Sequence, residues 1–470
     1  MAVSDVTASG QEGHEQRRIP ARPRALPARP TMTPPARARA PRRSRGSNRA
    51  RNVRSRGAAV LLVVLGAFLG WAVPRWEQHL PSTGLGFDAS TAQATLAAIA
   101  GGMITLAGFI VTAITLVIQT VQSMSPRLVS ALGHFSRYLV LFGLLIGTAL
   151  YALVALSQVQ NDLVPRGSVT LAVGLVLVDS VVVLRLLASL RHAVTGGGLS
   201  RGVAERLRTV IDQTYPPEPA MPVPPTADDA QRGTRVPVVH GGGPAVLLSV
   251  DEPKLVRLAA RHGLRIRFVR AIGDFAGAGA TIAFVEPVGG GGGVGVRRAA
   301  RVAACVRYGP SRTVEQDAAY GFRLLADIAI RALSPAVNDP TTAVQALDQI
   351  EDALLRLSRR SLGDAWLLDG SGTPRVSYPA PGWADFVSLA LDETLLYGSS
   401  NPQVVRRLRA LLEHVTAAAP QSRRPELARR TAALERLSAT ALSDPLLSAV
   451  ADVPDNQGLG GSAPRGDSPG

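Results

Sequence analysis

The chain of 470 residues carries a formal net charge of +16, one cysteine and seven histidines. Fourteen arginines and no acidic residue lie within residues 17–57, and the chain from Ala58 onward has a net charge of only +5. The positive charge is therefore concentrated in a tail, and this distribution argues against a basic nucleic-acid-binding domain. Because Cys305 is the single cysteine, no intrachain disulfide can form, and we expect Cys305 to be a small buried thiol. The histidines are scattered and lack zinc-ligand spacing, so we expect no metal and no cofactor.

The N-terminal segment, residues 1–57, is rich in arginine, proline and alanine. It contains too little apolar surface to fold, which predicts a disordered cytoplasmic tail. Next to a membrane we expect this tail to bind anionic lipid headgroups, at about 1 kcal/mol per arginine near the surface. The alternative is a tail that only sets the membrane topology and has no ligand.

Residues 58–190 contain four long apolar runs joined by short polar connectors. A hydrocarbon core of about 30 Å needs roughly 20 apolar helical residues, so the first run, of 16 residues, must extend to Trp76. The pattern predicts a domain of four transmembrane helices with the lipid bilayer as its partner. The runs are Ala58–Val73, Ala92–Val121, Tyr138–Ser157 and Val169–Leu190.

The distribution of arginine predicts the orientation of these helices. Arginines dominate the N-terminal tail, the connector 122–137 and the segment after Leu190, whereas the other two connectors hold one arginine each, offset by acidic residues. Because positive charge is retained on the cytoplasmic side, both termini are expected in the cytoplasm.

Polar and small residues inside the runs form a candidate intramembrane site. Ala97, Gly101 and Thr105 repeat at four-residue spacing, which permits close helix contact and favours a homo-oligomer. Thr105 and Thr112 supply hydroxyl groups, and Asp179 is an acid in mid-span that costs about 2.5–3.5 kcal/mol on insertion scales. Asp179, Thr105 and Thr112 are therefore functional candidates. The alternative is that Asp179 only hydrogen-bonds a neighbouring helix.

A juxtamembrane helix near Arg201–Gln213 and a solvent-facing proline-rich linker, Tyr215–Thr226, are predicted within residues 191–235. Residues 236–312 have strand character. Leu264–Arg270 alternates with Arg265 and Arg267 on the polar face, and with Thr281–Val285 it predicts a hairpin in a small sheet or partial barrel. Asp251 suits the N-cap of a short helix that runs to His262.

The glycine run Gly289–Gly293 is expected to be a flexible hairpin loop. A phosphate-binding loop needs a strand before it and a helix directly after it, whereas the basic stretch that follows here has a strand-like pattern.

The segment 313–343 is rich in polar residues at helical spacing. Thr313 with Gln316 predicts a capping box for a helix that ends near Leu333, and Asp339 suits the N-cap of the next helix, with Pro340 at its first position. The polar residues either form a helical hairpin with an intramolecular charge ladder, Arg323, Asp327 and Arg331, or gather around a pocket or subunit contact. The candidate cluster is Gln316, Asp317, Arg323, Asp327, Arg331, Asn338 and Asp339.

Three further helices are predicted, at Trp383–Tyr397, Pro402–Ala418 and Pro425–Ala441. Residues 313–450 thus form a helical cytoplasmic region, and residues 451–470 a disordered tail. The predicted fold is an α-helical membrane domain of four transmembrane helices, followed by a cytoplasmic α+β domain with a small β region and a C-terminal helical part.

Three stretches carry a resemblance to a known family: Ala97–Gln122, Ser125–Leu128, and Gln316–Asp317 with the segment ALSPAVNDPTTA at Ala332–Ala343. Together they resemble a bacterial family of predicted membrane proteins, domain of unknown function 2254, over roughly residues 58–440. The resemblance implies a multi-pass protein of the bacterial inner membrane with a cytoplasmic domain and no assigned activity. The arginine-rich tail extends beyond the shared region.

These features leave two functional hypotheses. One is a channel-like or transport-related oligomer with a cytoplasmic regulatory domain, and the alternative is a membrane-anchored sensor or scaffold whose cytoplasmic domain binds a ligand or a protein partner. An enzyme is not expected, because no nucleophile elbow, zinc pattern or P-loop occurs. Asp317, Asp327 and Asp339 are carboxylates with the chemistry to hold a divalent metal, although carboxylates in one hairpin are commonly caps and ion pairs.

Overall fold

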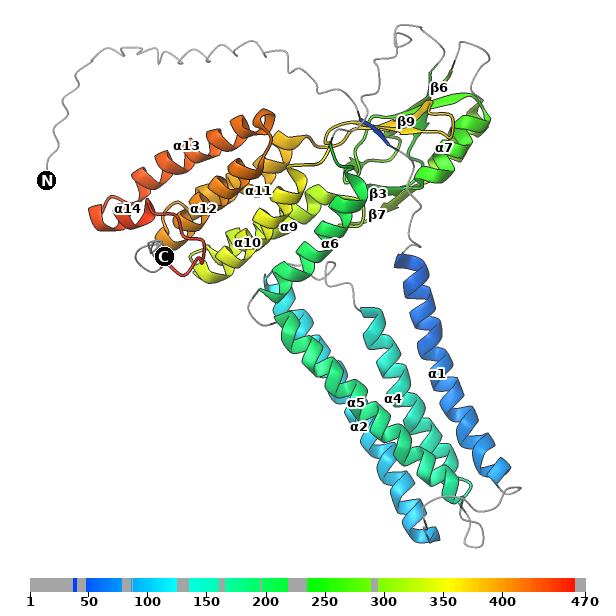
Figure 1. The fold of residues 1–470 in the computed structure, drawn as a ribbon. Helices are drawn as coiled ribbons and strands as arrows, with labels where there is room; N and C mark the ends of the chain where they lie inside the picture. Colours follow the sequence, from blue (N-terminus) through cyan, green and yellow to red (C-terminus); the bar gives the residue numbers. More distant parts are fainter. Residues whose placement is uncertain are drawn as a thin grey trace, which may run out of the picture. The chain divides into compact units, whose positions relative to one another are not determined.

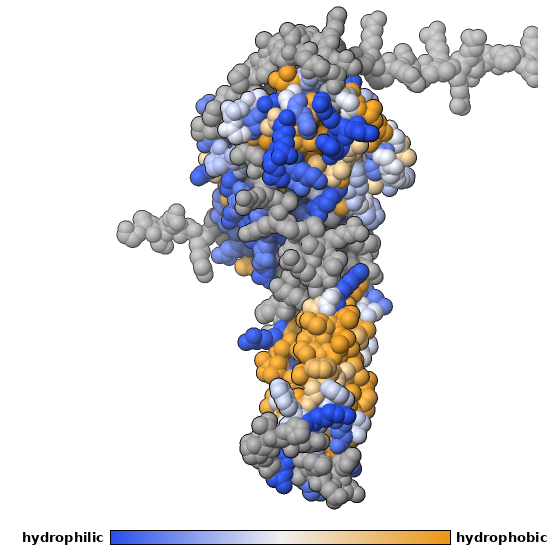
Figure 2. All heavy atoms as spheres, turned by 90° about the vertical axis from the view of Figure 1, so that its right-hand side faces the viewer, coloured by the Kyte–Doolittle hydropathy of each residue, from blue (hydrophilic) through white to orange (hydrophobic). Residues whose placement is uncertain are grey.

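The structure is a computed structural model that describes residues 37–39, 48–77, 86, 88–124, 135–159, 165–194, 197–218, 235–288 and 295–460. Its N-terminal part consists of four apolar helices long enough to cross a membrane (Figure 1). They are α1 (Asn48–Glu77), α2 (Ala89–Met124), α4 (Phe135–Leu156) and α5 (Arg166–Val194). The four predicted helices are confirmed as candidate spans, and apolar side chains cover much of their surface (Figure 2).

Glycines bring α1 and α4 into close contact. A Cβ at Gly66 would lie 2.1 Å from the carbonyl oxygen of Gly147, and one at Gly143 would lie 2.7 Å from the backbone of Ala59. Gly66–Gly70 and Gly143–Gly147 both have the four-residue spacing of small residues that lets membrane helices approach closely. At the end of α1, the carboxylate of Glu77 accepts hydrogen bonds from the N–H groups of Gly167 and Ser168 and so caps the start of α5.

The small-residue face of α2 makes no such contact within the described part of the chain. Ala97, Gly101 and Thr105 are exposed, and a Cβ at Gly101 would meet no described atom within 4 Å. The sequence therefore identified a motif for close packing on α2, whereas close packing inside this chain is made by α1 and α4.

The C-terminal domain, residues 198–460, contains two small sheets, one of which is extended by the strand at Arg37–Arg39. The six-stranded sheet has the order β1-β8-β9-β4-β6-β2, and the three-stranded sheet has the order β5-β3-β7. The strands are β1 (Arg37–Arg39), β2 (Val236–Val239), β3 (Ala245–Val250), β4 (Leu264–Phe268), β5 (Phe275–Ala276), β6 (Thr281–Pro287), β7 (Val306–Gly309), β8 (Ala365–Leu368) and β9 (Pro374–Tyr378). The antiparallel pairing of β4 with β6 confirms the predicted hairpin.

Arg265 differs from the predicted alternation. Leu264, Ile266 and Phe268 are buried as expected, but Arg265 is also only 7% exposed. Its guanidinium lies 5.6 Å from the ring centroid of Trp366 and 3.9 Å from Glu286. Trp366 belongs to β8. Both β8 and β9 lie in a region that was predicted to be helical, so the local sequence pattern did not reveal the strand that supplies this partner of Arg265.

Two helices accompany the sheets, α7 (Glu252–Arg261) and α8 (Val296–Ala303). The carboxylate of Asp251 accepts from the N–H of Lys254, so the predicted N-cap of α7 is confirmed. The basic stretch in α8 is a helix and not the expected strand, because Ala299 and Val302 alone turn inward while its arginines face outward. Gly289–Gly293 lies outside the described residues.

The remaining helices pack into a second core. They are α6 (Gly198–Thr214), α9 (Ala318–Ala332), α10 (Pro340–Leu357), α11 (Trp383–Gly398), α12 (Pro402–Ala418), α13 (Arg424–Ala441) and α14 (Pro445–Ala451), with a 3-10 turn at Gln421–Arg423. Phe322, Leu325 and Ile328 of α9 are buried in this core.

Three boundaries differ from the predictions. Tyr215, at the start of the proline-rich linker, is 3% exposed and stacks edge-on against Phe386, so it belongs to the core and not to a solvent-facing segment. β1 and the first turns of α1 lie within residues 1–57. Residues beyond Val453 pack against α12, where Gln403 donates to the carbonyl oxygen of Gly458.

Candidate functional site

The polar residues predicted to cluster in segment 313–343 are divided among three places. Gln316 and Asp317 precede α9 and line a cavity, Arg323 and Asp327 lie on the outer face of α9, and Asn338 and Asp339 form the turn before α10. Arg331 is exposed. No single pocket collects all seven residues.

The predicted charge ladder of α9 forms only in part. Arg323 donates to Asp327, and it also makes a two-pronged contact with Glu393 of α11. Arg331, the expected third member of the ladder, is one turn farther along and exposed. The ladder therefore ties α9 to α11 and is a structural ion-pair network.

The turn between α9 and α10 is built by Asn338 and Asp339. Asn338 has a φ of 46°, a left-handed conformation that asparagine tolerates better than most residues. The carboxylate of Asp339 accepts from the N–H of Thr342, 3.0 Å away, which confirms the predicted N-cap of α10. The turn conformation explains the asparagine at position 338, and the N-cap explains the aspartate at position 339, so both residues have a structural role.

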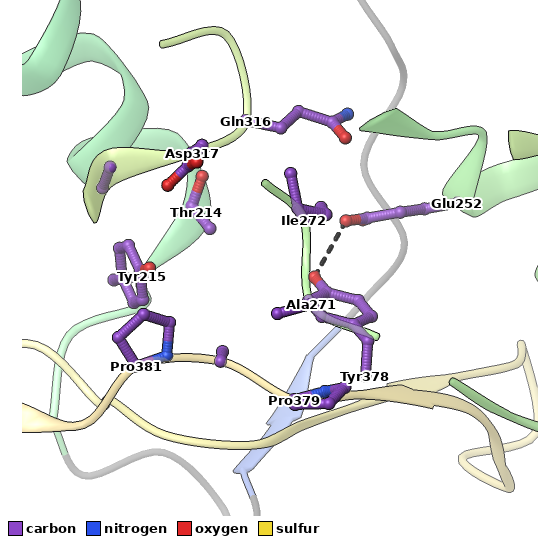
Figure 3. A pocket seen from close by; sticks show the side chains of 12 residues that line it. Thr214, Tyr215, Glu252, Ala271, Ile272, Gln316, Asp317, Tyr378, Pro379 and Pro381 are labelled. Carbon is purple, nitrogen blue, oxygen red and sulfur yellow. Dashed lines mark hydrogen bonds between the residues drawn. The ribbon is translucent and has the colours of Figure 1, made fainter. Parts of the chain in front are cut away.

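A cavity of about 30 Å³ lies where the sheet region meets the helices. Segments distant in sequence line it: the end of α6, the start of α7, the loop before β5, the segment before α9 and the loop after β9. Figure 3 shows Asp317 and Thr214 on one side, and Glu252 and Tyr378, joined by a hydrogen bond, on the other. The volume suits one water molecule or one small ion.

Asp317 is the most unusual group in this cavity. It is 7% exposed, and its Oδ1 accepts from the N–H of Tyr320, so Asp317 is the N-cap of α9. The predicted capping box of Thr313 and Gln316 is therefore wrong. The other oxygen, Oδ2, is buried and has no hydrogen-bond partner among the described residues. An unpartnered buried carboxylate oxygen is costly unless something neutralises it.

The surroundings raise the pKa of Asp317 from 3.8 to about 6, chiefly because burial disfavours the charged form. The Tyr320 N–H and the charge of Arg312 lower the pKa, and Asp274 adds a small rise. The site thus holds a carboxyl group whose charge changes between mildly acidic and neutral pH.

Gly273 allows the close approach of Asp317. Its φ is 97°, and a Cβ there would lie 2.4 Å from Oδ2 of Asp317. Only glycine meets both demands without strain. The sequence does not link Gly273 to Asp317, because no local pattern joins residues from two separate loops.

Two hydrogen bonds hold the walls of the cavity together. Tyr378 of β9 donates to Glu252, which is 3% exposed, and Gln316 accepts from the N–H of Val250 at the end of β3. Sequence reasoning missed Glu252 and Tyr378. Glu252 is an acidic residue at the start of a predicted helix, and Tyr378 lies near three prolines. Neither local sequence indicates a cavity, because the two residues come together only in the folded chain.

The intramembrane candidates lie in different environments. Asp179 of α5 is 1% exposed, and the described residues supply no hydrogen bond to its carboxylate; buried Thr148 of α4 is its polar neighbour. Thr105 and Thr112 are exposed on α2 and donate to the carbonyl oxygens of Gly101 and Gly108, one turn back. The structure does not bring the two threonines to Asp179.

Within the described residues, no group of three or more histidine, cysteine or acidic side chains is placed to hold a metal ion. Cys305 is buried, and burial raises the pKa of its thiol.

Comparison with known proteins supplies a family but no activity. The model of a family described as "Predicted membrane protein (DUF2254)" matches residues 57–414. Uncharacterized proteins of Mycobacterium bovis and Mycobacterium tuberculosis are 29% identical to the chain over 255 residues, which are 54% of this chain and 48% of each relative. The chain thus spans about half the length of the curated relatives it matches. No solved structure shows a significant match.

Proposed function

Because the chain belongs to the family of predicted membrane proteins described as DUF2254, we propose that its four apolar helices anchor a sensor domain. The sensed species is a small monovalent cation that binds in the cavity around Asp317. The observation that carries this proposal is the buried Oδ2 of Asp317, which has no hydrogen-bond partner among the described residues, in a side chain that lines a cavity of about 30 Å³.

The physical argument rests on charge. Above about pH 6 the carboxylate of Asp317 is ionised. Arg312 and the Tyr320 N–H offset only part of the cost of burying this charge, so the charge favours opening of the surrounding structure. A cation in the cavity offsets that charge and stabilises the contact of the loop before β5 with the start of α9. At lower pH a proton neutralises the same group, so proton and cation compete for one site.

The arginine distribution supports the orientation that we adopt for this sensor. We place both termini in the cytoplasm of a bacterial cell, with the four helices in the inner membrane and the arginine-rich tail on anionic headgroups. Labelling of single cysteines in intact cells tests this placement. Labelling of the C-terminal domain from outside would contradict it.

The test of cation binding measures the thermal unfolding midpoint of the full chain in detergent at pH 8. Potassium, sodium or ammonium chloride is compared with N-methylglucamine chloride at equal ionic strength. We expect one of the inorganic cations to raise the midpoint of the wild type. The rise should disappear in Asp317→Asn and persist in Asp339→Asn, which makes the same change at the N-cap of α10. Equal midpoints in all salts would rule out the cation.

A second candidate function is a channel-like or transport-related oligomer. The observations that favour it are the exposed small-residue face of α2 and the buried Asp179 of α5. Intramembrane acids are functional candidates because they are costly to insert. Proton and potassium flux through liposomes containing the protein tests this function, with Asp179→Asn as the variant. Flux equal to that of empty liposomes would contradict it.

A further inference from the structure

A groove of about 520 Å³ lies at the C-terminal end of α10, separate from the cavity around Asp317. Arg356, Arg359 and Arg360 line it, and Pro217, Leu355 and Ala418 supply an apolar surface. The volume falls within the range of small-molecule sites, about 300–1,000 Å³.

The groove has more positive than negative side chains. Arg360 pairs with Asp212 at 2.6 Å and Arg208 with Asp352 at 2.6 Å, and Arg356 reaches both carboxylates, 3.5 and 3.4 Å away. Arg359 is exposed, and its guanidinium makes no ion pair or hydrogen bond with the described residues. Three arginines thus share two carboxylates and Arg359 adds a fourth positive charge, so the surplus is two positive charges.

The helix end does not cancel this surplus. The C-terminal carbonyl groups of a helix carry partial negative charge and repel anions. Here the buried Arg423 donates to the carbonyl oxygens of Leu357 and Arg360, and Arg360 donates to that of Tyr215. The carbonyl groups of Leu357 and Arg360 are therefore satisfied by a guanidinium group that is itself paired with Glu218.

We propose that this groove binds a phosphate monoester attached to an apolar group. A monoester carries a charge of about −2 near neutral pH, which matches the surplus. Guanidinium groups present paired N–H donors that fit phosphate oxygens, and the apolar surface receives the attached group. The proposal does not depend on the role of Asp317.

The test titrates the full chain in detergent with phenyl phosphate and follows binding by calorimetry. We expect saturable binding that weakens with salt, that weakens at least fivefold in Arg359→Gln and that is unchanged in Arg257→Gln, an exposed arginine of α7. Asp352→Asn removes a negative charge from the groove and should tighten binding. This second variant tests the charge argument independently of any loss of an arginine.

The source of the phosphate is separated by nanodiscs that contain either phosphatidic acid or phosphatidylcholine. Binding of phenyl phosphate supports a soluble ligand, and a dependence on Arg359 seen only with phosphatidic acid supports a lipid headgroup. Absence of binding to both, or binding that Arg359→Gln leaves unchanged, would overturn the proposal.

Discussion

Asp317 combines two opposing contributions to stability. As the N-cap of α9 it satisfies the N–H of Tyr320, which typically contributes about 1 kcal/mol. As a buried acid it destabilises the fold when ionised. Its pKa is about 6 in the folded state against 3.8 as the ordinary value, so the folded protein binds the extra proton between these two values. Stability is therefore highest below about pH 4 for this group and falls as the pH rises towards 6.

Asp317→Asn keeps a good N-cap and removes the charge, so it should free the protein from this pH dependence. In N-methylglucamine buffer at pH 8 we expect the variant to be more stable than the wild type, by on the order of 2–3 kcal/mol. Near pH 4 the two should be equal. Unfolding midpoints measured from pH 4 to 8 check this, and a wild type that gains stability relative to the variant as the pH rises would contradict the sign.

Gly273 is the second residue whose identity the cavity requires. Gly273→Ala combines an unfavourable φ of 97° with a Cβ 2.4 Å from Oδ2 of Asp317. We expect a loss of about 1–3 kcal/mol. Gly277→Ala, on the other side of β5 and with no described atom within 4 Å of the new Cβ, should be nearly neutral. Equal unfolding midpoints for the two variants would show that the close approach to Asp317 does not matter.

At the scale of elements, the α1–α4 pair depends on backbone contact. The Cβ atoms missing at Gly66 and Gly147 leave space for the opposite backbone, and within a bilayer the gain comes from packing and not from the hydrophobic effect. Gly147→Leu should separate the two helices, lower the unfolding midpoint in detergent and increase proteolysis at the connector after α1. Gly101→Leu, on the open face of α2, should leave the monomer intact.

The helices and strands of the C-terminal domain show which local signals were sufficient. The N-caps Asp251 and Asp339 and the bounds of α12 agree with the sequence predictions, because caps and proline act within one turn. Strands β8 and β9 were not predicted. Each has four or five residues, and each is stabilised by neighbours rather than by its own pattern.

At the scale of the whole molecule, the homo-oligomer remains a prediction, and α2 is where we expect its contact. In a chain whose Cys305 is replaced by alanine, Thr105→Cys should cross-link to a second copy in native membranes. Leu177→Cys serves as the control, because Leu177 is exposed on α5, another apolar helix. Cross-linking at Leu177 but not at Thr105 would move the contact away from α2.

The sequence alone determined the membrane character, the four spans, most helices of the C-terminal domain and two of its caps. These features arise from hydropathy over about 20 residues or from contacts within a single turn, and both depend only on residues that are close together in the sequence. The family resemblance, too, was carried by contiguous stretches such as Ala332–Ala343.

Only the tertiary structure decided which polar residues matter together. It separated Asp317 from Arg323 and Asp339, its neighbours in sequence, and placed it beside Gly273 of another loop. It also buried Arg265 against Trp366, about a hundred residues later in the chain. Burial, the pKa of a carboxyl group and the shape of a cavity depend on what packs from elsewhere, and no local spacing of residues contains that information.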